Sequence, residues 1–386
     1  MTCCEKLRVI PTNINLASLK RVNMSGCSRL RTFPDFSSNM ELLDVHNTMI
    51  EDVPSTIAEG WLRSCELNIG STRLKRLTHV PEYVRRLDLS NSDIKKIPDC
   101  VIGLSELQIL SIKNCRKLVL VQGLPPSLLF LHADDCVSLK SVCFSYCKPN
   151  VALDDWKCAK SEDELMRKFT FYNCYSLEEE ARRVIIQGWE NMSVGLPGKE
   201  VPSEFTHKAK GNSITISICD WTFSASSRFK ACLLFSPPAK WFPHTINIVC
   251  RLRSKGVLIN EILFYPNKRP WYNSTKIPSQ LLTDHLFIFD ENLFGFGGGR
   301  GLEVDSDIQF EFICKYQNSK IIECGVQILG EEGESSSSSS EWKEQSDGAV
   351  EASKDENLVK TSKHTGWRRG LKKLVLMKKK NKNKTE

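Results

Sequence analysis

The chain has 386 residues, 41% of them hydrophobic and 26% charged, and a formal net charge of +7 at pH 7. This length predicts about two to three domains, and the apolar fraction is sufficient for packed cores. Residues 360–386 carry eleven Lys or Arg and one Glu, a charge of +10, so the rest of the chain has a net charge of −3. This distribution does not support a nucleic-acid-binding surface spread over the whole protein, although it supports a local basic arm.

The sixteen cysteines do not indicate a disulfide scaffold. Residues 1–15 contain no apolar core typical of a signal peptide, and no apolar run reaches the roughly 18 residues that a membrane span needs. Reduced thiols in the cytoplasm or nucleus are therefore expected. Cys143, Cys147, Cys158 and Cys174 form no C-x-x-C pair, so we expect no metal site.

Two consecutive copies of one pattern, residues 107–121 and 128–142, identify an internal repeat. In both copies apolar residues and one Cys follow the spacing L-x-x-L-x-L-x-x-C-x-x-L-x-x-V, with Ile or Ala as variants. This spacing is typical of a leucine-rich repeat, in which a short strand is followed by an Asn or Cys that turns the chain and hydrogen-bonds the next coil. Each coil leaves an apolar edge uncovered, so one repeat predicts others stacked on it.

Further copies lie in residues 16–34, 40–54, 67–77 and 84–98, and the pattern returns once at residues 169–177. The small residue that ends each strand, here called the ladder residue, recurs in the six main copies at steps of 21, 24, 20, 23 and 21 residues, inside the roughly 20 to 29 expected. The first residues, from Cys4, also fit part of a repeat, so we expect the chain to be the C-terminal part of a longer solenoid. The predicted ladder residues are Cys27, Thr48, Thr72, Ser92, Cys115, Cys136 and Cys174.

The residues that flank the inward leucines should face outward on the concave side of the resulting horseshoe. They are polar, small and mixed in charge, which suits protein recognition. An ordinary solvated strand face is the alternative for any one of them. The candidate partner-binding residues on this face are Asp44, His46, Asp88, Lys113, His132 and Asp134.

After the last repeat the apolar period changes twice. Ser176 and Glu179 have capping-box spacing, and Leu177, Ala181 and Val184 continue at helical intervals, so an amphipathic helix should cover the end of the stack. Short β-type runs follow and predict an antiparallel sandwich. These runs are residues 213–218, 231–235, 245–252, 257–264, 285–290, 307–316 and 321–329.

The segment from residue 331 onward should be disordered. Residues 331–359 are acidic and Ser-rich and cannot bury enough apolar surface to order themselves. The basic cluster that follows has three possible interpretations. It is a solvated tail, a nuclear import signal, or an amphipathic helix that binds an anionic membrane or a partner protein. Its charges are Arg368, Arg369, Lys372, Lys373, Lys378, Lys379 and Lys380.

Several strings in the second half resemble the domain that follows the repeats in plant TIR-type nucleotide-binding leucine-rich-repeat immune receptors. The strings are LPGKEVPSEFTHKAKGNSITI (196–216), FKACLLF (229–235), DHLFIF (284–289) and IIECGVQIL (321–329), and FTFYNCYSLEEEAR (169–182) resembles the junction before them. The resemblance covers roughly residues 1–330. It implies a C-terminal jelly-roll and Ig-like domain.

The resemblance also implies the domain limits and the function. We expect a truncated α/β solenoid at 1–177, a sandwich with a leading helix at 178–330, and a tail at 331–386. In the family, the TIR domain cleaves NAD and a nucleotide-binding module acts as the switch, whereas repeats and jelly roll recognise a pathogen effector. Gly198 and Lys199 precede Glu200, where a phosphate-binding loop needs Ser or Thr, so neither catalysis nor a cofactor carries over.

The chain is therefore predicted to be the recognition half of an intracellular immune receptor, acting in the cytoplasm or nucleus. Its partner would be an effector or a guarded host protein, with the missing receptor domains as further partners. Since the family's recognition surface includes the jelly-roll domain, Trp241, Phe242, Trp271 and Tyr272 are candidate contacts, with edge packing as the alternative. A free-standing adaptor with a membrane- or nucleic-acid-binding tail is the second hypothesis.

Overall fold

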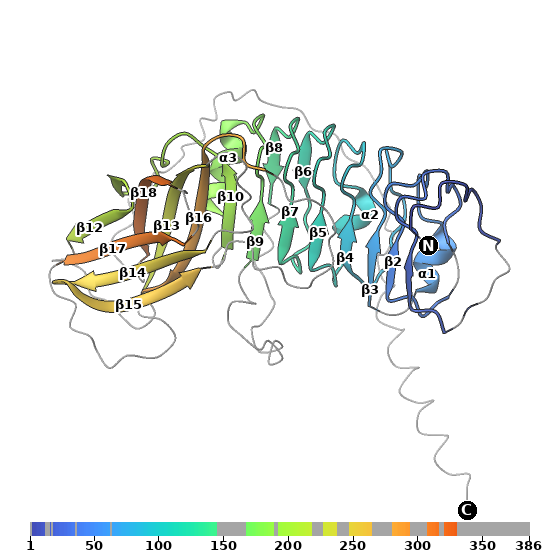
Figure 1. The fold of residues 1–386 in the computed structure, drawn as a ribbon, viewed down its shortest axis with the longest axis horizontal. Coiled ribbons are helices and arrows are strands. Elements are labelled where there is room, and N and C mark those ends of the chain that lie inside the picture. Colours follow the sequence, from blue (N-terminus) through green and yellow to red (C-terminus); the bar gives the residue numbers. More distant parts are fainter. Residues whose placement is uncertain are drawn as a thin grey trace, which may run out of the picture. The chain divides into compact units, whose positions relative to one another are not determined.

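A computed structural model describes residues 2–11, 16, 18–34, 37–61, 64–144, 167–188, 192–217, 227–237, 247–264, 280–293, 307–315 and 320–329. All of these residues belong to one compact unit, Met1–Glu332. The unit consists mainly of β-strands, with three short helices in its described part (Figure 1). The basic tail and the four aromatic candidates from Trp241 to Tyr272 lie outside the described residues.

The first half forms a parallel sheet with one strand per repeat, which confirms the predicted solenoid. Each strand pairs with the strand of the next coil in a register that repeats from coil to coil. In pairing order the strands are β1 (Arg21–Asn23), β2 (Leu42–Asp44), β3 (Cys65–Asn68), β4 (Val84–Asp88), β5 (Ile109–Ser111), β7 (Phe130–His132) and β9 (Arg167–Thr170).

A leucine of each of the strands β2, β3, β4, β5 and β7 points into the stack. Leu43, Leu67, Leu87, Leu110 and Leu131 occupy equivalent positions of the parallel register, and all are 0% exposed. Fully burying each such side chain contributes roughly 1.5–3 kcal/mol relative to leaving it in water. A continuous apolar core therefore runs through the coils.

The return path of each coil carries different elements in early and late repeats. The second and fourth coils use short helices, α1 (Ser55–Gly60) and α2 (Asp99–Ile102). The last two regular coils use the strands β6 (Leu120–Gln122) and β8 (Ser141–Cys143), which pair in parallel. Val121 and Val142, the last apolar positions of the repeat, are buried there.

A residue with positive φ precedes most of the ladder residues. Asn47, Asn91, Asn114 and Asp135 have φ between 54° and 62°, a region that Asn and Asp enter more readily than other non-glycine residues. Each backbone N–H at these sites donates to a carbonyl of the next coil. A cysteine in the ladder then bonds back to the preceding coil: the Cys136 thiol donates to the Ile112 carbonyl at 3.1 Å. A hydroxyl in the ladder stays within its own coil, as the Thr48 hydroxyl does in donating to the Val45 carbonyl at 2.8 Å.

The third repeat corrects the ladder prediction at Thr72. Thr72 is exposed, whereas Ser71 is 2% exposed and its carbonyl accepts a hydrogen bond from the Leu74 N–H at 3.0 Å. In this repeat Gly70 precedes the ladder residue, and it does not have a positive φ. A Cβ on Gly70 would lie 2.0 Å from the Ser90 carbonyl oxygen, so only glycine allows this close approach.

With Ser71 in the ladder, the steps between ladder residues become regular. From Cys27 through Thr48, Ser71, Ser92 and Cys115 to Cys136 they are 21, 23, 21, 23 and 21 residues. The six predicted ladder residues other than Thr72 are all buried. The irregular steps of 24 and 20 in the sequence-based alignment were therefore the sign of a displaced ladder residue.

The solenoid sheet continues without interruption into the second half of the chain (Figure 1). Strand β10 (Met192–Pro197) pairs in parallel with β9 and antiparallel with β16. The remaining strands of this sheet are β16 (His285–Asn292), β13 (Arg228–Ser236), β18 (Lys320–Leu329) and β11 (His207–Lys210). A single sheet of 12 strands thus changes from parallel to antiparallel at β10.

A second, antiparallel sheet covers one face of the C-terminal part of the first. Its order is β12 (Ser213–Ser217), β17 (Asp307–Cys314), β14 (Ile248–Ser254) and β15 (Val257–Phe264). Aromatic rings from both sheets meet in the shared core: Phe264 stacks on Phe289 with ring centroids 4.5 Å apart, and Phe229 lies 5.1 Å from Phe310. On the other face, Cys232, Leu234 and Ile288 join the solenoid core.

All seven predicted β runs correspond to strands of this region, but two further strands of its described part were missed. Strand β10 is buried along its whole length and therefore shows no alternation. Strand β11 has the sequence HKAK and lies at the edge of the sheet. Lysines are common at such edges because they discourage pairing with other chains.

The predicted helix after the last repeat is α3 (Glu179–Gln187), with Ala181, Ile185 and Ile186 buried. The predicted capping box is wrong. The N-cap is Glu178 without a side-chain cap hydrogen bond, and the Ser176 hydroxyl donates to the Val137 carbonyl at 2.6 Å instead. Ser176 thus fixes the chain to the preceding coil.

Candidate recognition surface

The strand face is defined here as the side of the solenoid sheet that displays the residues on either side of the inward leucines. It includes all six polar candidates predicted from the repeats, but their exposure differs. Asp44, His46, Lys113 and His132 are partly exposed, whereas Asp88 and Asp134 are 5% and 3% exposed. The first four can therefore contact a partner directly.

At the N-terminal end of the strand face, Asp44 and His46 form a pair within one coil. The Asp44 Oδ1 lies 2.6 Å from His46 Nδ1 and also accepts a hydrogen bond from the His46 N–H at 3.2 Å. Both side chains are 14% exposed. The carboxylate thus holds the imidazole in one orientation, with its remaining nitrogen available to a partner.

In the middle coils a buried hydroxyl pair links two strands. Ser90 Oγ and Ser111 Oγ lie 2.9 Å apart, and Asp88 Oδ1 accepts the Ser90 N–H at 2.9 Å. Since buried polar groups that are satisfied in this way resist rearrangement, these residues stiffen the surface. Asp88 is therefore better described as a support for the strand face than as a contact residue.

Near the last coils the strand face carries an ion pair. Lys113 Nζ lies 3.1 Å from Asp134 Oδ2, with side chains 31% and 4% exposed. Asp134 Oδ1 also accepts the Tyr172 N–H at 3.3 Å, and the His132 ring lies 3.4 Å from Thr170 Oγ1. These contacts leave the Lys113 ammonium at the surface and place its counter-charge beneath it.

The strand face ends where the second sheet begins to cover the first. Tyr172, which follows β9, packs in the core shared by the two sheets. A Cβ on Gly195 of β10 would lie 2.2 Å from the Tyr172 ring, so glycine is needed for this close contact. The polar face of the solenoid thus meets the side of the sandwich at Tyr172.

Asn173 and His285 connect the solenoid to the sandwich at this point. Asn173, with φ 58°, donates its N–H to His285 Nε2 at 3.1 Å, and its Nδ2 donates to Asp135 Oδ1 at 2.8 Å and to the Gln280 carbonyl at 2.7 Å. The His285 Nδ1 donates to the Thr283 carbonyl at 2.7 Å. His285 must be neutral to accept from Asn173.

Burial at this junction lowers the pKa of the His285 imidazole. Desolvation lowers the pKa of its imidazole from 6.5 to about 4, against smaller raising effects of the Thr283 carbonyl and of Asp134, Asp284 and Asp135. The Tyr172 ring lies 5.7 Å from the imidazole. Neither Asn173 nor His285 was predicted as functional. The only signal in the sequence was the Asn before the Cys174 ladder residue, because an Asn also precedes the ladder residue at Asn47, Asn91 and Asn114.

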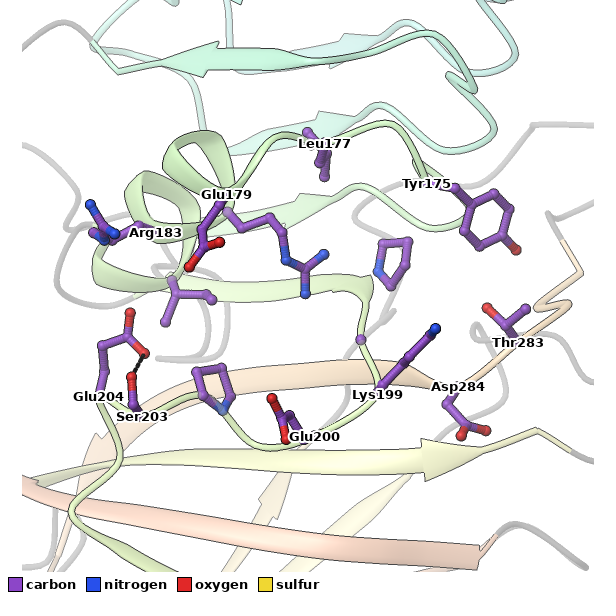
Figure 2. Close-up of a pocket in the computed structure, with 15 residues that line it drawn as sticks. Tyr175, Leu177, Glu179, Arg183, Lys199, Glu200, Ser203, Glu204, Thr283 and Asp284 are labelled. Carbon is purple, nitrogen blue, oxygen red and sulfur yellow. Dashed lines mark hydrogen bonds between the residues drawn. The ribbon is translucent and has the colours of Figure 1, made fainter.

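A cleft of about 1100 Å³ lies beside α3 at the same junction, and its lining includes part of the 198–204 segment. Figure 2 shows Tyr175 and Thr283 at one end of the cleft and Ser203 with Glu204 at the other. Burial lowers the pKa of Arg182 in its lining, an effect that Glu179 partly offsets. The lining includes both signs of charge, with Arg182, Arg183 and Lys199 opposed by Glu179, Glu200, Glu204 and Asp284.

The described residues contain no group of three or more His, Cys, Asp or Glu side chains arranged to hold a metal ion. Of the four cysteines considered for zinc, Cys147 and Cys158 lie outside the described part. Within that part, no helix has the length and apolar character needed to cross a membrane.

No protein-family profile matches the chain. Among curated proteins, it is similar to "Disease resistance protein RML1A" of Arabidopsis thaliana, with 38% identity over 348 residues that cover 86% of this chain and 31% of the relative. It is 37% identical to "Disease resistance protein RML1B" over 76% of this chain and 26% of the relative, and 29% identical to "Probable disease resistance protein RPP1" over 81% and 24%.

The chain thus spans less than a third of the length of these relatives. Among solved structures, the leucine-rich repeat domain of the type III effector XopL aligns with 18% identity and a TM-score of 0.30, covering 44% of this chain and 66% of that one. A likeness at this level carries no argument about function.

Proposed function

Because the chain is a homologue of plant disease resistance proteins, as its sequence resemblance indicated, we propose that it is the effector-recognition region of an intracellular plant immune receptor. In this proposal, residues 1–177 are the recognition solenoid and residues 178–330 the jelly-roll and Ig-like domain of TIR-type receptors. Residues 331–386 are a tail. The receptor acts in the cytoplasm or nucleus.

The observation that carries the proposal is the polar strand face. Its side chains are held in place by contacts such as Asp44–His46 and Lys113–Asp134, and a pre-ordered surface loses less conformational entropy when a partner binds. The partner is a pathogen effector or a host protein that an effector modifies. Asp44, His46, Lys113 and His132 are the proposed contacts, because they combine partial exposure with fixed orientation.

Paired substitutions on the strand face test the proposal. The His46→Ala, His132→Ala variant removes two imidazole rings that do not belong to the apolar core of the solenoid, so its melting should stay close to that of wild type. Co-expression with a library of secreted proteins from plant pathogens should give a partner for the wild-type chain and lose it for the variant. The control variant Lys315→Ala, Lys320→Ala changes exposed residues of the sandwich and should keep the partner.

If the partner binds both variants equally, the strand face is not the recognition surface. Trp241, Phe242, Trp271 and Tyr272 are then the next candidates, to be substituted in pairs. A variant that loses binding with unchanged melting would identify contact residues, whereas loss of stability would indicate edge packing.

The proposal assigns no reaction to this chain. In the resembled family, NAD cleavage belongs to the TIR domain, and nucleotide binding needs a phosphate-binding loop. The purified chain should therefore neither consume NAD nor bind ADP, as measured by liquid chromatography and by calorimetry. NAD turnover by the pure chain would contradict the assignment.

A further inference from the structure

The flank of the solenoid just after the ladder residues carries a concentration of positive charge. In the segments 27–34, 48–54, 71–80, 92–99, 115–122 and 136–143 there are ten Lys or Arg and four Asp or Glu, a net charge of +6. The chain before residue 360 sums to −3, so the remainder of it carries −9. All ten cations are exposed: Arg29, Arg31, Arg73, Lys75, Arg76, Lys95, Lys96, Arg116, Lys117 and Lys140.

Five of these cations surround one groove, which we call the basic groove. Its volume is about 680 Å³, and it lies across the coils of residues 71–80, 92–99 and 115–122. Two of its lysines are neutralised locally, Lys96 by Asp99 at 2.8 Å and Lys117 by Asp93 at 2.6 Å. Lys75, Arg76 and Lys95 form no ion pair within the described residues.

The lining of the basic groove is apolar between these charges. Leu77, Ile94 and Pro98 line it together with Cys100, whose thiol donates to the Leu77 carbonyl at 3.3 Å. Leu77 and Ile94 also belong to the solenoid core and are 5% and 1% exposed. The floor is therefore recessed and fixed by the packing of the coils.

From this arrangement we propose that the basic groove binds an acidic peptide segment of a partner protein, with carboxylates on the lysine rim and an apolar side chain over the floor. Charge complementarity steers such a segment to the groove. A flat lipid surface or a nucleic-acid backbone would contact the rim lysines but would place no apolar group in the hollow. The site is separate from the strand face and adds a second interaction to the proposed receptor.

Charge reversal at the rim tests the proposal in the full chain. The variant Lys75→Glu, Lys95→Glu changes two exposed cations of the groove, and the control Lys315→Glu, Lys320→Glu changes two exposed cations of the sandwich by the same total charge. The probe is a short fluorescent peptide of Glu and Asp with one central Trp, measured by anisotropy. The groove variant should bind it about tenfold more weakly than wild type, and the control should not.

The basic residues 360–386 are identical in all variants, so only a difference between variants reports on the groove. Carbodiimide cross-linking followed by mass spectrometry locates the peptide independently, because it joins a peptide carboxylate to a neighbouring lysine. Links at Lys75 and Lys95 are expected. Melting curves that match wild type establish that both variants are folded.

Three results would overturn the proposal. One is equal peptide binding by the groove variant and the control, with no links at Lys75 or Lys95. Another is equal binding of a second peptide in which Ala replaces the Trp, since the apolar floor would then have no role. The last is tighter binding of duplex DNA or phosphatidylserine vesicles that is lost in the same groove variant, which would assign the groove to a phosphate surface.

Discussion

The solenoid and the sandwich share one sheet but are built by opposite rules. In the solenoid, each strand pairs with a strand one repeat away, as β4 does with β5. In the sandwich, β10 pairs with β16 and β12 pairs with β17, across roughly ninety residues in each case. Contacts that repeat at short range make an approximately additive array, whereas long-range pairs form together or not at all. A destabilising substitution should therefore have local effects in the solenoid and wider effects in the sandwich.

The largest losses of folding stability are expected when one core side chain is removed from each region. Phe289→Ala removes a ring in contact with four other rings of the shared core and should cost roughly 3–5 kcal/mol. Leu110→Ala should cost about 2–5 kcal/mol. Urea titration measures both.

The two substitutions should also differ in how far along the chain they destabilise the structure. Hydrogen exchange should increase mainly in the coils next to Leu110 in the one variant, and throughout the sandwich in the other. Exchange that rises evenly over the whole chain in both variants would show that the shared sheet makes the two regions one cooperative unit.

The junction between the regions should respond to pH. Burial lowers the pKa of His285 to about 4 in the folded state, against an ordinary value of 6.5. The unfolded state therefore binds a proton more readily, so this stability is present above pH 6.5 and is lost as pH falls toward 4. The loss should reach about 3 kcal/mol.

Chemical unfolding between pH 7 and pH 4 checks this expectation. His285→Gln retains a hydrogen-bond acceptor without the titration, so the difference between its pH profile and that of wild type isolates the imidazole. Parallel profiles for the two proteins would contradict a buried neutral His285 at the junction.

The smallest effects on stability are expected in the third repeat, where two substitutions test whether Ser71 or Thr72 is the ladder residue. Ser71→Val replaces a buried hydroxyl whose Oγ accepts the Arg73 N–H at 3.3 Å, and loss of that hydrogen bond should cost about 1–2 kcal/mol. Thr72→Val changes an exposed side chain and should stay within roughly 0.5 kcal/mol of wild type. Thermal melting of the two variants measures this, and the opposite order would restore Thr72 to the ladder.

The repeat period alone determined much of the solenoid. Positions such as Leu110, Leu131 and Cys136 were placed in the core correctly because their spacing recurs, and a recurring pattern can be read without knowing the fold. The polar strand face followed from the same register. Even the error at Thr72 left a trace, in the uneven steps of 24 and 20 residues between ladder residues.

Features made by residues far apart were decided only by the tertiary structure. Strand β10 could not be recognised from alternation, because all of its residues are buried in the tertiary structure. The contact between Asn173 and His285 joins residues 112 positions apart, and the basic groove combines cations of three coils. Such contacts depend on which residues come close together in three dimensions. Because these contacts do not repeat along the chain, they produce no periodic pattern in the sequence.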